Sequence, residues 1–168
     1  MMYYVILFKA VLNNEMDIHI AHMRAAIEEA KKASLKGEVP IGAVIVKDGE
    51  IIARGHNLTE TARDATCHAE MIAIREASEA LGNWRLAGCE MYVTAEPCTM
   101  CAGAIVVSRL DAVYAGTEST RSGAAGSVRD ILNSSEFKNG IIFEIGILKD
   151  ECAALLTDFF RTLRGNNQ

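Results

Sequence analysis

The sequence lacks an excess of positive charge, and it lacks a hydrophobic run long enough to span a bilayer. Acidic residues outnumber basic ones by 22 to 17, so the net charge of -5 provides no general attraction for nucleic acid. Nucleic-acid binding would therefore depend on a local patch or on a groove between subunits. The apolar start of the chain is interrupted by Lys9 and has neither a basic leader nor a small-residue cleavage site, so we expect no signal peptide and no membrane anchor.

The cysteines also lack the pattern of a disulfide scaffold. Five are present, and two of them form a C-x-x-C at positions 98 and 101. Free thiols of this kind suit a reducing compartment, where thiolates are available to hold metal. We therefore expect a cytoplasmic protein.

The chain length predicts one domain. Its 168 residues, half of them hydrophobic, are enough for one well-packed core and too few for two. A helix pattern begins at Asp17, with apolar residues at steps of three and four. We assign residues 17–168 to a single domain and interpret residues 1–16 as an N-terminal extension or a start-site artefact. A hydrophobic strand is the alternative for these first residues.

Strand and helix patterns alternate along the rest of the chain. Asp48-Gly49 favours the positive φ of a tight hairpin turn between two apolar runs. The order of elements predicts an α/β fold, a three-layer αβα sandwich around a five-stranded, mixed and largely parallel sheet. Ligands of such sheets bind beyond the carboxyl ends of the strands. Strands are predicted at 41–46, 51–53, 91–94, 112–115 and 141–145, and helices at 17–36, 66–81, 97–107 and 149–163.

Two short stretches contain the residues of a catalytic zinc site. His68 and Glu70 lie in the first turn of one predicted helix, and Cys98 and Cys101 lie at the start of another. Residues at i and i+3 share a helix face, and the positive end of a helix favours thiolates, so both sulfurs can bind one ion. One histidine and two cysteines occupy three zinc positions and leave the fourth for a water. Glu70 is the predicted proton carrier beside that water.

Two structural interpretations compete with a catalytic site. In the first, the cysteines are buried core residues and the histidine is unrelated to them. In the second, Cys67 is a fourth ligand, which would close the site and remove the water position. Since Cys67 is adjacent to His68, simultaneous ligation is awkward, and we expect Cys67 to be a small packing residue.

The pattern H-x-E followed by P-C-x-x-C is the signature of zinc-dependent nucleobase deaminases. Further segments match one branch of these enzymes: EVPIGAVIV (38–46), GHN (55–57), NWRL (83–86), PCTMCAGA (97–104), GAAGS (123–127), GIL (146–148), ECAALL (151–156) and FFR (159–161). On these segments the chain resembles the bacterial tRNA-specific adenosine deaminases, within the cytidine deaminase-like superfamily. The resemblance extends from about Asp17 to Arg164, so it makes residues 17–168 a single zinc-dependent deaminase domain.

The resemblance implies a homodimer that deaminates the wobble adenosine of a tRNA anticodon loop by hydrolysis, which gives inosine. One zinc ion per subunit would be held by His68, Cys98 and Cys101. Glu70 would shuttle protons for a zinc-activated water, taking its proton and delivering protons to N1 and to the departing ammonia.

The resemblance also implies contacts with the substrate. Asn57 would contact the target nucleoside, and the backbone N–H of Ala69 would contact the base edge. Possible contacts with the anticodon stem-loop are Ser119, Arg121, Phe159, Phe160 and Arg161.

Two details concern these contacts. Phe159 and Phe160 are adjacent, so we expect one to pack into the core while the other stacks on a base. The related enzymes commonly carry Asp-Pro at the position of Ser119, a departure that bears on substrate affinity and identity.

Two other functions stay open. Deamination of a free nucleobase or nucleoside, such as guanine, cytosine or cytidine, is favoured by the acidic composition and by Ser119. A non-catalytic, zinc-stabilised RNA-binding domain is the further alternative. Outside the motifs, His56 either lines the pocket or is an exposed loop residue, and we expect His19 and His22 at the surface.

Overall fold

The structure is a computed structural model that describes residues 2–134 and 140–165, with side chains described from residue 16 onward. Helices and strands alternate along the chain, as the sequence patterns predict. Their bounds are α1 (Met2–Leu35), β1 (Gly42–Lys47), β2 (Glu50–His56), α2 (Thr59–Ala62), α3 (Ala69–Leu81), β3 (Cys89–Ala95), α4 (Thr99–Ser108), β4 (Ala112–Thr117), β5 (Ile142–Ile145) and α5 (Lys149–Gly165).

The five strands form one sheet in the order β2-β1-β3-β4-β5. β1 pairs antiparallel with β2 and β3, whereas β4 is parallel to both β3 and β5. The turn between β1 and β2 is the predicted hairpin, since Asp48 and Gly49 have φ angles of 50° and 80°. The predicted five-stranded mixed sheet is confirmed. It is not largely parallel, because β1 is antiparallel to both of its neighbours.

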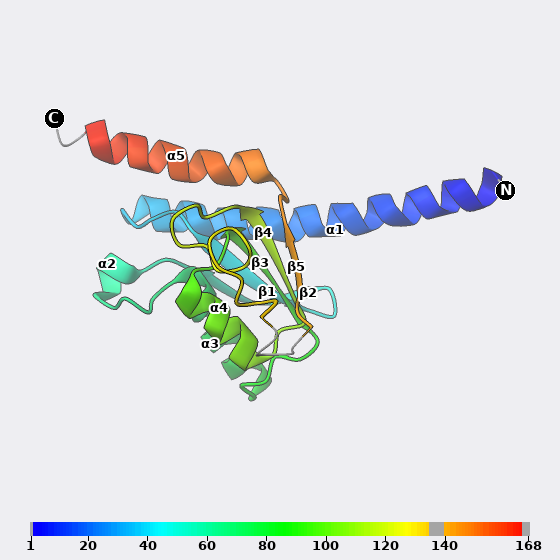
Figure 1. Ribbon diagram of the computed structural model, residues 1–168, viewed down its shortest axis with the longest axis horizontal. Coiled ribbons are helices and arrows are strands. Elements are labelled where there is room, and N and C mark those ends of the chain that lie inside the picture. The colour runs from blue at the N-terminus through cyan, green and yellow to red at the C-terminus, as the bar shows by residue number, and fades with distance from the viewer. Residues whose placement is uncertain (1, 135–139, 166–168) are drawn as a thin grey trace.

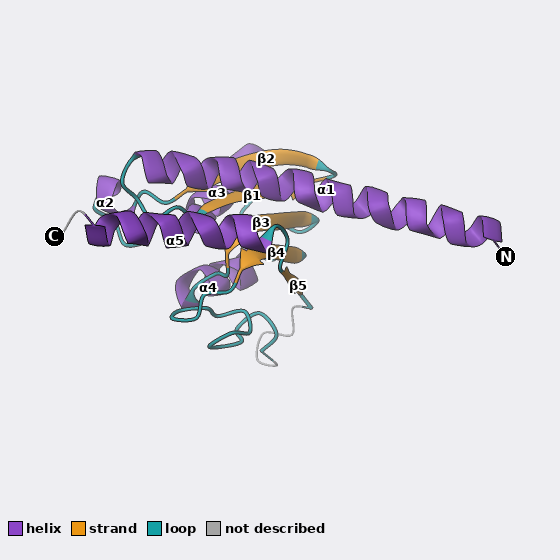
Figure 2. Ribbon diagram, turned by 90° about the horizontal axis from the view of Figure 1, so that it is seen from above, coloured by secondary structure: helices purple, strands orange, loops and turns teal. Residues whose placement is uncertain are grey.

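Helices cover both faces of the sheet, with α1 and α5 on one side and α3 and α4 on the other (Figures 1 and 2). The residues of β1 alternate between the two cores. Ala43 and Ile45 pack in the core that contains α3 and α4, and Val44 and Val46 pack in the core that contains α1. Because both faces of β1 are buried, it is hydrophobic at nearly every position. The predicted three-layer sandwich is confirmed.

Helix α1 is longer than predicted. It begins at Met2 rather than at Asp17, and its first turns extend beyond the sheet (Figure 1). Residues 2–35 contain neither glycine nor proline, so no residue of this kind interrupts the helix before Asp17. The strand alternative for this segment is wrong, and Met1 lies outside the described residues. Within the part of the chain that the structure describes, no helix is both long and apolar enough to cross a membrane.

Candidate active site

Two helix N-termini bring the predicted metal ligands together near the carboxyl end of β3. β3 leads into α4, whose N-cap residue is Cys98 and whose first turn contains Cys101. The N-cap residue of α3 is His68. Both helices therefore direct their positive ends toward the ligand group, which favours anionic groups there.

The two helices start later than predicted. We expected Thr66 to cap α3 and Pro97 to begin α4, but the helices start at Ala69 and Thr99. Thr66 does not cap α3 because its N–H and its hydroxyl both donate to Asp64 Oδ1, at 2.8 and 2.7 Å. His68 and Cys98 consequently occupy the cap positions, where the backbone is still extended.

The three predicted ligand atoms have the spacing of a tetrahedral zinc site. The sulfurs of Cys98 and Cys101 are 3.7 Å apart, and His68 Nδ1 lies 3.7 Å from the first and 3.5 Å from the second. Tetrahedral ligands with a Zn–S distance of about 2.3 Å and a Zn–N distance of about 2.0 Å are separated by roughly 3.5 to 3.8 Å. The residues therefore fit a zinc ion as they stand.

The protonation of the two thiols is strongly coupled. The neighbouring Cys101 thiol and the His68 ring lower the pKa of Cys98 to about 3, although burial opposes this shift. Cys98 and burial together raise the pKa of Cys101 well above its usual range. These opposite shifts mean that Cys98 gives up its proton more readily than Cys101 does. Metal binding has to displace the remaining proton.

Cys67 is not part of the ligand group. Its sulfur lies 3.5 Å from Asp64 Oδ2 and 3.9 Å from a guanidinium nitrogen of Arg75. Among the described histidines, cysteines and carboxylates, only His68, Cys98 and Cys101 gather closely enough to hold a metal ion. Three protein ligands leave one tetrahedral position open, which is typical of catalytic rather than structural zinc sites.

Glu70 is a buried carboxyl group with an unused oxygen. Its exposed fraction is 3%, and Oε2 has no hydrogen-bond partner among the described residues. Burial raises the pKa of Glu70 above its usual value. An unpartnered buried oxygen beside a metal-ligand group is an arrangement suited to a proton acceptor.

A cavity of about 540 Å³ lies beside the ligand group and takes its walls from several parts of the chain. The chain between α1 and β1 contributes one wall, the segment after β4 a second, and α5 a third. The lining residues are Val39, Ile41, His68, Glu70, Ala95, Glu96, Cys98, Glu118, Ser119, Thr120, Arg121, Ser122, Leu156 and Phe160.

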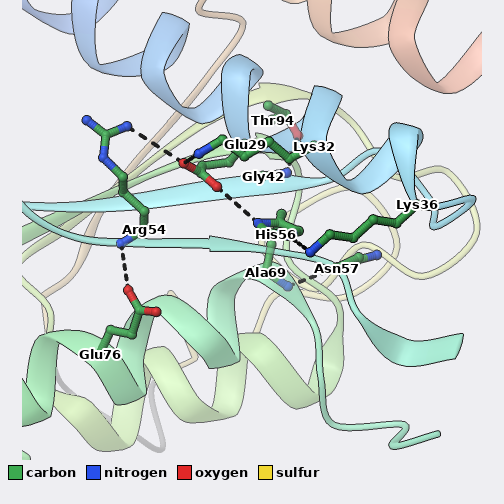
Figure 3. A network of polar contacts seen from close by, with 10 residues as sticks. All are labelled: Glu29, Lys32, Lys36, Gly42, Arg54, His56, Asn57, Ala69, Glu76 and Thr94. Carbon is green, nitrogen blue, oxygen red and sulfur yellow. Dashed lines mark hydrogen bonds and ion pairs between the residues drawn. The ribbon is translucent and has the colours of Figure 1, made fainter. Parts of the chain in front are cut away.

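The two predicted nucleoside contacts bind each other. The Ala69 N–H donates to Asn57 Oδ1 at 2.9 Å, and Asn57 is 5% exposed (Figure 3). Neither residue is among those that line the cavity, so the contact of the Asn57 side chain with a nucleoside stays a prediction. The predicted contact through the Ala69 N–H would have to replace an existing hydrogen bond.

The predicted RNA contacts divide into two groups. Ser119, Arg121 and Phe160 line the cavity together with Glu70. Phe160 is 44% exposed, which leaves its ring accessible at the cavity wall.

Phe159 and Arg161 lie elsewhere. Phe159 lines a separate hollow with Ser34 and Leu163, between the end of α1 and α5. Arg161 donates to Asp158 one turn away, at 2.8 Å, and its side chain is 74% exposed. The two adjacent phenylalanines therefore lie in different surroundings, with Phe160 at the cavity. The expectation that the other one packs into the core is wrong, because Phe159 is only partly buried and belongs to neither core cluster.

Several cavity residues were missed by the sequence analysis, most clearly Glu96 and Glu118. Val39 and Ile41 lie within the matched segment 38–46, and Leu156 lies within 151–156, so the resemblance of these segments to the deaminases was the only available indication. Glu96 directly precedes the proline of the P-C-x-x-C. Nothing local to the sequence shows that its side chain turns toward the segment after β4.

His56 belongs to a polar network rather than to the cavity. Its Nδ1 lies 3.0 Å from Glu29 and its Nε2 lies 3.0 Å from Lys36 Nζ, and the ring is 17% exposed (Figure 3). A carboxylate only accepts and an ammonium only donates, so Nδ1 carries the proton. Both sequence-based alternatives for His56 are therefore wrong, because Glu29 reaches it from a distant helix.

The surface prediction for the paired histidines is also wrong for His22. That ring is 8% exposed and packs 4.9 Å from Tyr92, centroid to centroid. His19 Nδ1 lies 2.8 Å from the Tyr92 hydroxyl. The cause is the sheet position of Tyr92, whose ring faces α1.

Comparison with known proteins agrees with this geometry. The family model for the cytidine and deoxycytidylate deaminase zinc-binding region matches residues 16–117. The tRNA-specific adenosine deaminase of Bacillus subtilis is 51% identical over 143 residues, covering 85% of this chain and 89% of that protein.

Solved structures give the same result. One from a study of A-to-I editing by tRNA:A34 deaminases has a TM-score of 0.78 and 42% identity, covering 81% of this chain and 99% of that chain. A guanine deaminase of Bacillus subtilis has a TM-score of 0.58 and 35% identity, covering 86% and 92%. The chain therefore belongs to the zinc-dependent cytidine and deoxycytidylate deaminase family, within its tRNA-specific adenosine deaminase branch.

Proposed function

We propose that this protein deaminates the wobble adenosine of a tRNA anticodon loop to inosine. The observation that carries the proposal is the buried, unpartnered Glu70 oxygen beside three zinc-ligand residues, in a chain 51% identical to a tRNA-specific adenosine deaminase. The overall reaction consumes one water and releases one ammonia.

We infer that His68, Cys98 and Cys101 hold one zinc ion per subunit. Bound there, zinc supplies the Lewis acidity that makes a water molecule ionisable near neutral pH. The low pKa of Cys98 and the positive helix ends keep negative charge available at the ligand group.

Glu70 carries the protons in this scheme. Its carboxylate accepts a proton from the attacking water and returns one to N1 of the adenine, and a second transfer protonates the departing amine. Because its pKa is raised by burial, the group is closer to the ideal for accepting and donating in the same cycle.

Other residues, at the cavity and near it, position the substrate. We infer that Asn57 Nδ2 contacts the nucleoside, that Phe160 stacks on a base and that Arg121 contacts a phosphate. The Ala69 N–H reaches the base edge only after exchange of its bond to Asn57. Ser119 also faces the cavity and is available as a hydrogen-bond partner. We infer that Phe159 and Arg161, which lie outside the cavity, contact the stem-loop from other positions on α5.

We further infer a cytoplasmic homodimer in which residues 17–168 form the deaminase domain and residues 1–16 extend it. The family match from residue 16 onward supports this division. An acidic chain also benefits from a groove between two copies, where the arginines of both can face one RNA.

An anticodon stem-loop with a wobble adenosine tests the function. Wild-type protein is expected to form inosine, and Glu70→Ala is expected to keep its zinc and form none. Inosine formation by Glu70→Ala would contradict the mechanism. The same RNA with the adenosine moved one position from the wobble site is the matched substrate control.

Deamination of a free base is the second candidate, favoured by the similarity to a guanine deaminase and by Ser119 at the cavity. Ammonia release from guanine or cytosine, with none from RNA, would select it. Full zinc content with RNA binding and no turnover of either substrate would select the non-catalytic RNA-binding alternative.

A further inference from the structure

Glu96 is a buried carboxylate that connects the zinc-ligand turn to the segment of chain after β4. It lies between β3 and the zinc-ligand residue Cys98, and its exposed fraction is 4%. Its Oε1 accepts hydrogen bonds from the backbone N–H groups of Ala125 and Ser127, both at 3.0 Å. Its Oε2 accepts from the Ser119 N–H at 3.1 Å and from the Ser127 hydroxyl.

All four hydrogen bonds come from one segment of chain, residues 119–127, which we name the β4 loop. The loop also contacts the turn that carries Glu96, because the Ala124 N–H donates to the Pro97 carbonyl at 2.9 Å and Gly123 forms a bridge with Cys98. The β4 loop is therefore bound to the residues immediately before and at the first cysteine ligand.

Gly123 shows how closely the β4 loop approaches the carboxylate. A Cβ at this position would lie 2.2 Å from Glu96 Oε2 and 2.3 Å from Ser127 Oγ. No side chain fits there without moving the loop or the carboxylate. Contact with Glu96 therefore explains the glycine at position 123, whereas Gly126 has a φ of 141°, a backbone conformation that favours glycine.

The start of the β4 loop is a wall of the cavity. Ser119, Arg121 and the residues beside them line it opposite the ligand group that contains His68 and Cys98. The Ser119 N–H bond to Glu96 is the attachment nearest to these lining residues. Without it, Ser119 would keep only its carbonyl bonds within the loop, from the Gly123 N–H and the Ser127 hydroxyl, and the loop would be held to the zinc-ligand turn further along, at Gly123 to Ser127.

We propose that Glu96 is a positioning residue for substrate binding, holding the β4 loop against the zinc-ligand turn so that Ser119 and Arg121 face the substrate. The inference rests on the proposed function, and it adds that substrate affinity depends on a carboxylate whose two oxygens both accept hydrogen bonds from the β4 loop.

Glu96→Gln tests the attachments made through Oε2. The glutamine keeps a carbonyl oxygen that can accept the Ala125 and Ser127 N–H groups. Its NH2 group then faces the Ser119 N–H and the Ser127 hydroxyl: two donors meet at Ser119, so that bond is lost, whereas the hydroxyl can turn and accept from the NH2 group. We expect the KM for the anticodon stem-loop to rise about tenfold with kcat within about twofold, since a hydrogen bond to a charged acceptor is removed from binding.

Hydrogen exchange of the substrate-free protein gives a readout that does not depend on activity. In Glu96→Gln the amide of Ser119 is expected to exchange roughly tenfold faster, while amides of β3 and β4 keep their rates. The zinc content is expected to stay at one per chain. Ser127→Ala, which removes only the hydroxyl donor, should shift KM in the same direction by about threefold and serves if Glu96→Gln does not fold.

Glu38→Gln is the matched control. Glu38 is 2% exposed and also accepts two backbone N–H groups, those of Glu60 and Thr61, but from a segment outside the β4 loop. Glu38→Gln should lower the melting temperature by about as much as Glu96→Gln does, without raising the KM for the anticodon stem-loop. Equal KM shifts in both variants would reduce Glu96 to a general structural role and overturn the proposal.

Three other outcomes would also contradict the proposal. An unchanged KM, an unchanged exchange rate at Ser119, or a fall in kcat that follows loss of zinc would each overturn the positioning role. If wild-type protein deaminates a free base and no RNA, the proposed function fails by itself. The exchange measurement and the KM for that base then decide the role of Glu96.

Discussion

Two buried carboxylates, Glu70 in the cavity and Glu29 on α1, have opposite surroundings. Glu70 Oε2 has no hydrogen-bond partner in the described parts of the chain. Glu29 accepts from Lys32 at 2.7 Å and from His56 at 3.0 Å, and it is 2% exposed (Figure 3). A buried polar atom without a partner costs stability, whereas a fully bonded one contributes to it. The cavity therefore keeps a cost that only a ligand can offset, and the Glu29 network stabilises the fold.

Loss of a zinc ligand should have the largest effect on the cavity. Cys101→Ala is expected to lose both zinc and all detectable deamination, because two ligands do not retain the ion well. Metal analysis and inosine formation measure the two losses. Cys67→Ala is the matched control, since Cys67 lies outside the ligand group, and it should keep both properties. A zinc-loaded Cys101→Ala protein would show that the ligand set is misassigned.

Glu70→Gln should separate activity from stability. We expect kcat to fall by about 10²- to 10⁴-fold, the usual contribution of a general acid–base group. The free energy of unfolding should not decrease, because Oε2 loses no hydrogen bond and the neutral amide is cheaper to bury. Steady-state kinetics and urea unfolding give the two numbers. A marked destabilisation would mean that Glu70 has a structural partner, and the contrast with Glu29 would fail.

Glu29→Gln should behave in the opposite way. We expect the free energy of unfolding to fall by about 1–2 kcal/mol, because a neutral amide accepts weaker hydrogen bonds than a carboxylate does. The effect is no larger because Lys32 and Arg54, which pair with Glu29, are about half exposed to solvent. Activity should change by less than about threefold.

The neighbouring Glu28 is a matched control. It forms the same kind of pair with Lys31 at 2.7 Å, but both side chains are exposed. Glu28→Gln should therefore change stability by less than about 0.5 kcal/mol. If the two glutamine variants are equally stable, burial does not distinguish these ion pairs.

The smallest expected effect is the pH dependence of the Glu29 contribution. Burial by itself would raise the pKa of Glu29, but the hydrogen bonds and charges of Lys32 and His56 outweigh it, so the pKa lies below 4.5. A lowered folded-state pKa means that the stabilisation is present above pH 4.5 and is lost as the pH falls through the folded value. The stability difference between wild type and Glu29→Gln should be constant from pH 7 to about pH 5 and should shrink below that range. A difference that grows toward acid would contradict this sign.

Much of the fold follows from local patterns. The positive-φ requirement at Asp48-Gly49 and the runs of apolar residues predict the strands and the hairpin, because these preferences act within a few residues. The pairing of β1 with β3 was not predicted, since a strand's partner is selected by packing across the chain. The start of α1 at Met2 was not predicted because Asp17 has the side chain of an N-cap residue. An aspartate can also lie inside a helix, and no glycine or proline before it interrupts this one.

By itself, the sequence predicted the chemistry of this protein. His68, Cys98 and Cys101 are recognisable because metal ligation requires fixed residue types at short spacings, and Glu70 is recognisable from its place in the H-x-E pattern. Only the tertiary structure decided how the other polar groups are used. It paired Glu29 with His56, bound Glu96 to the β4 loop, left Glu70 Oε2 without a partner and placed Phe160 rather than Phe159 at the cavity. The physical reason is that burial and hydrogen-bond partners arise from contacts between segments far apart in the chain, which no local pattern encodes.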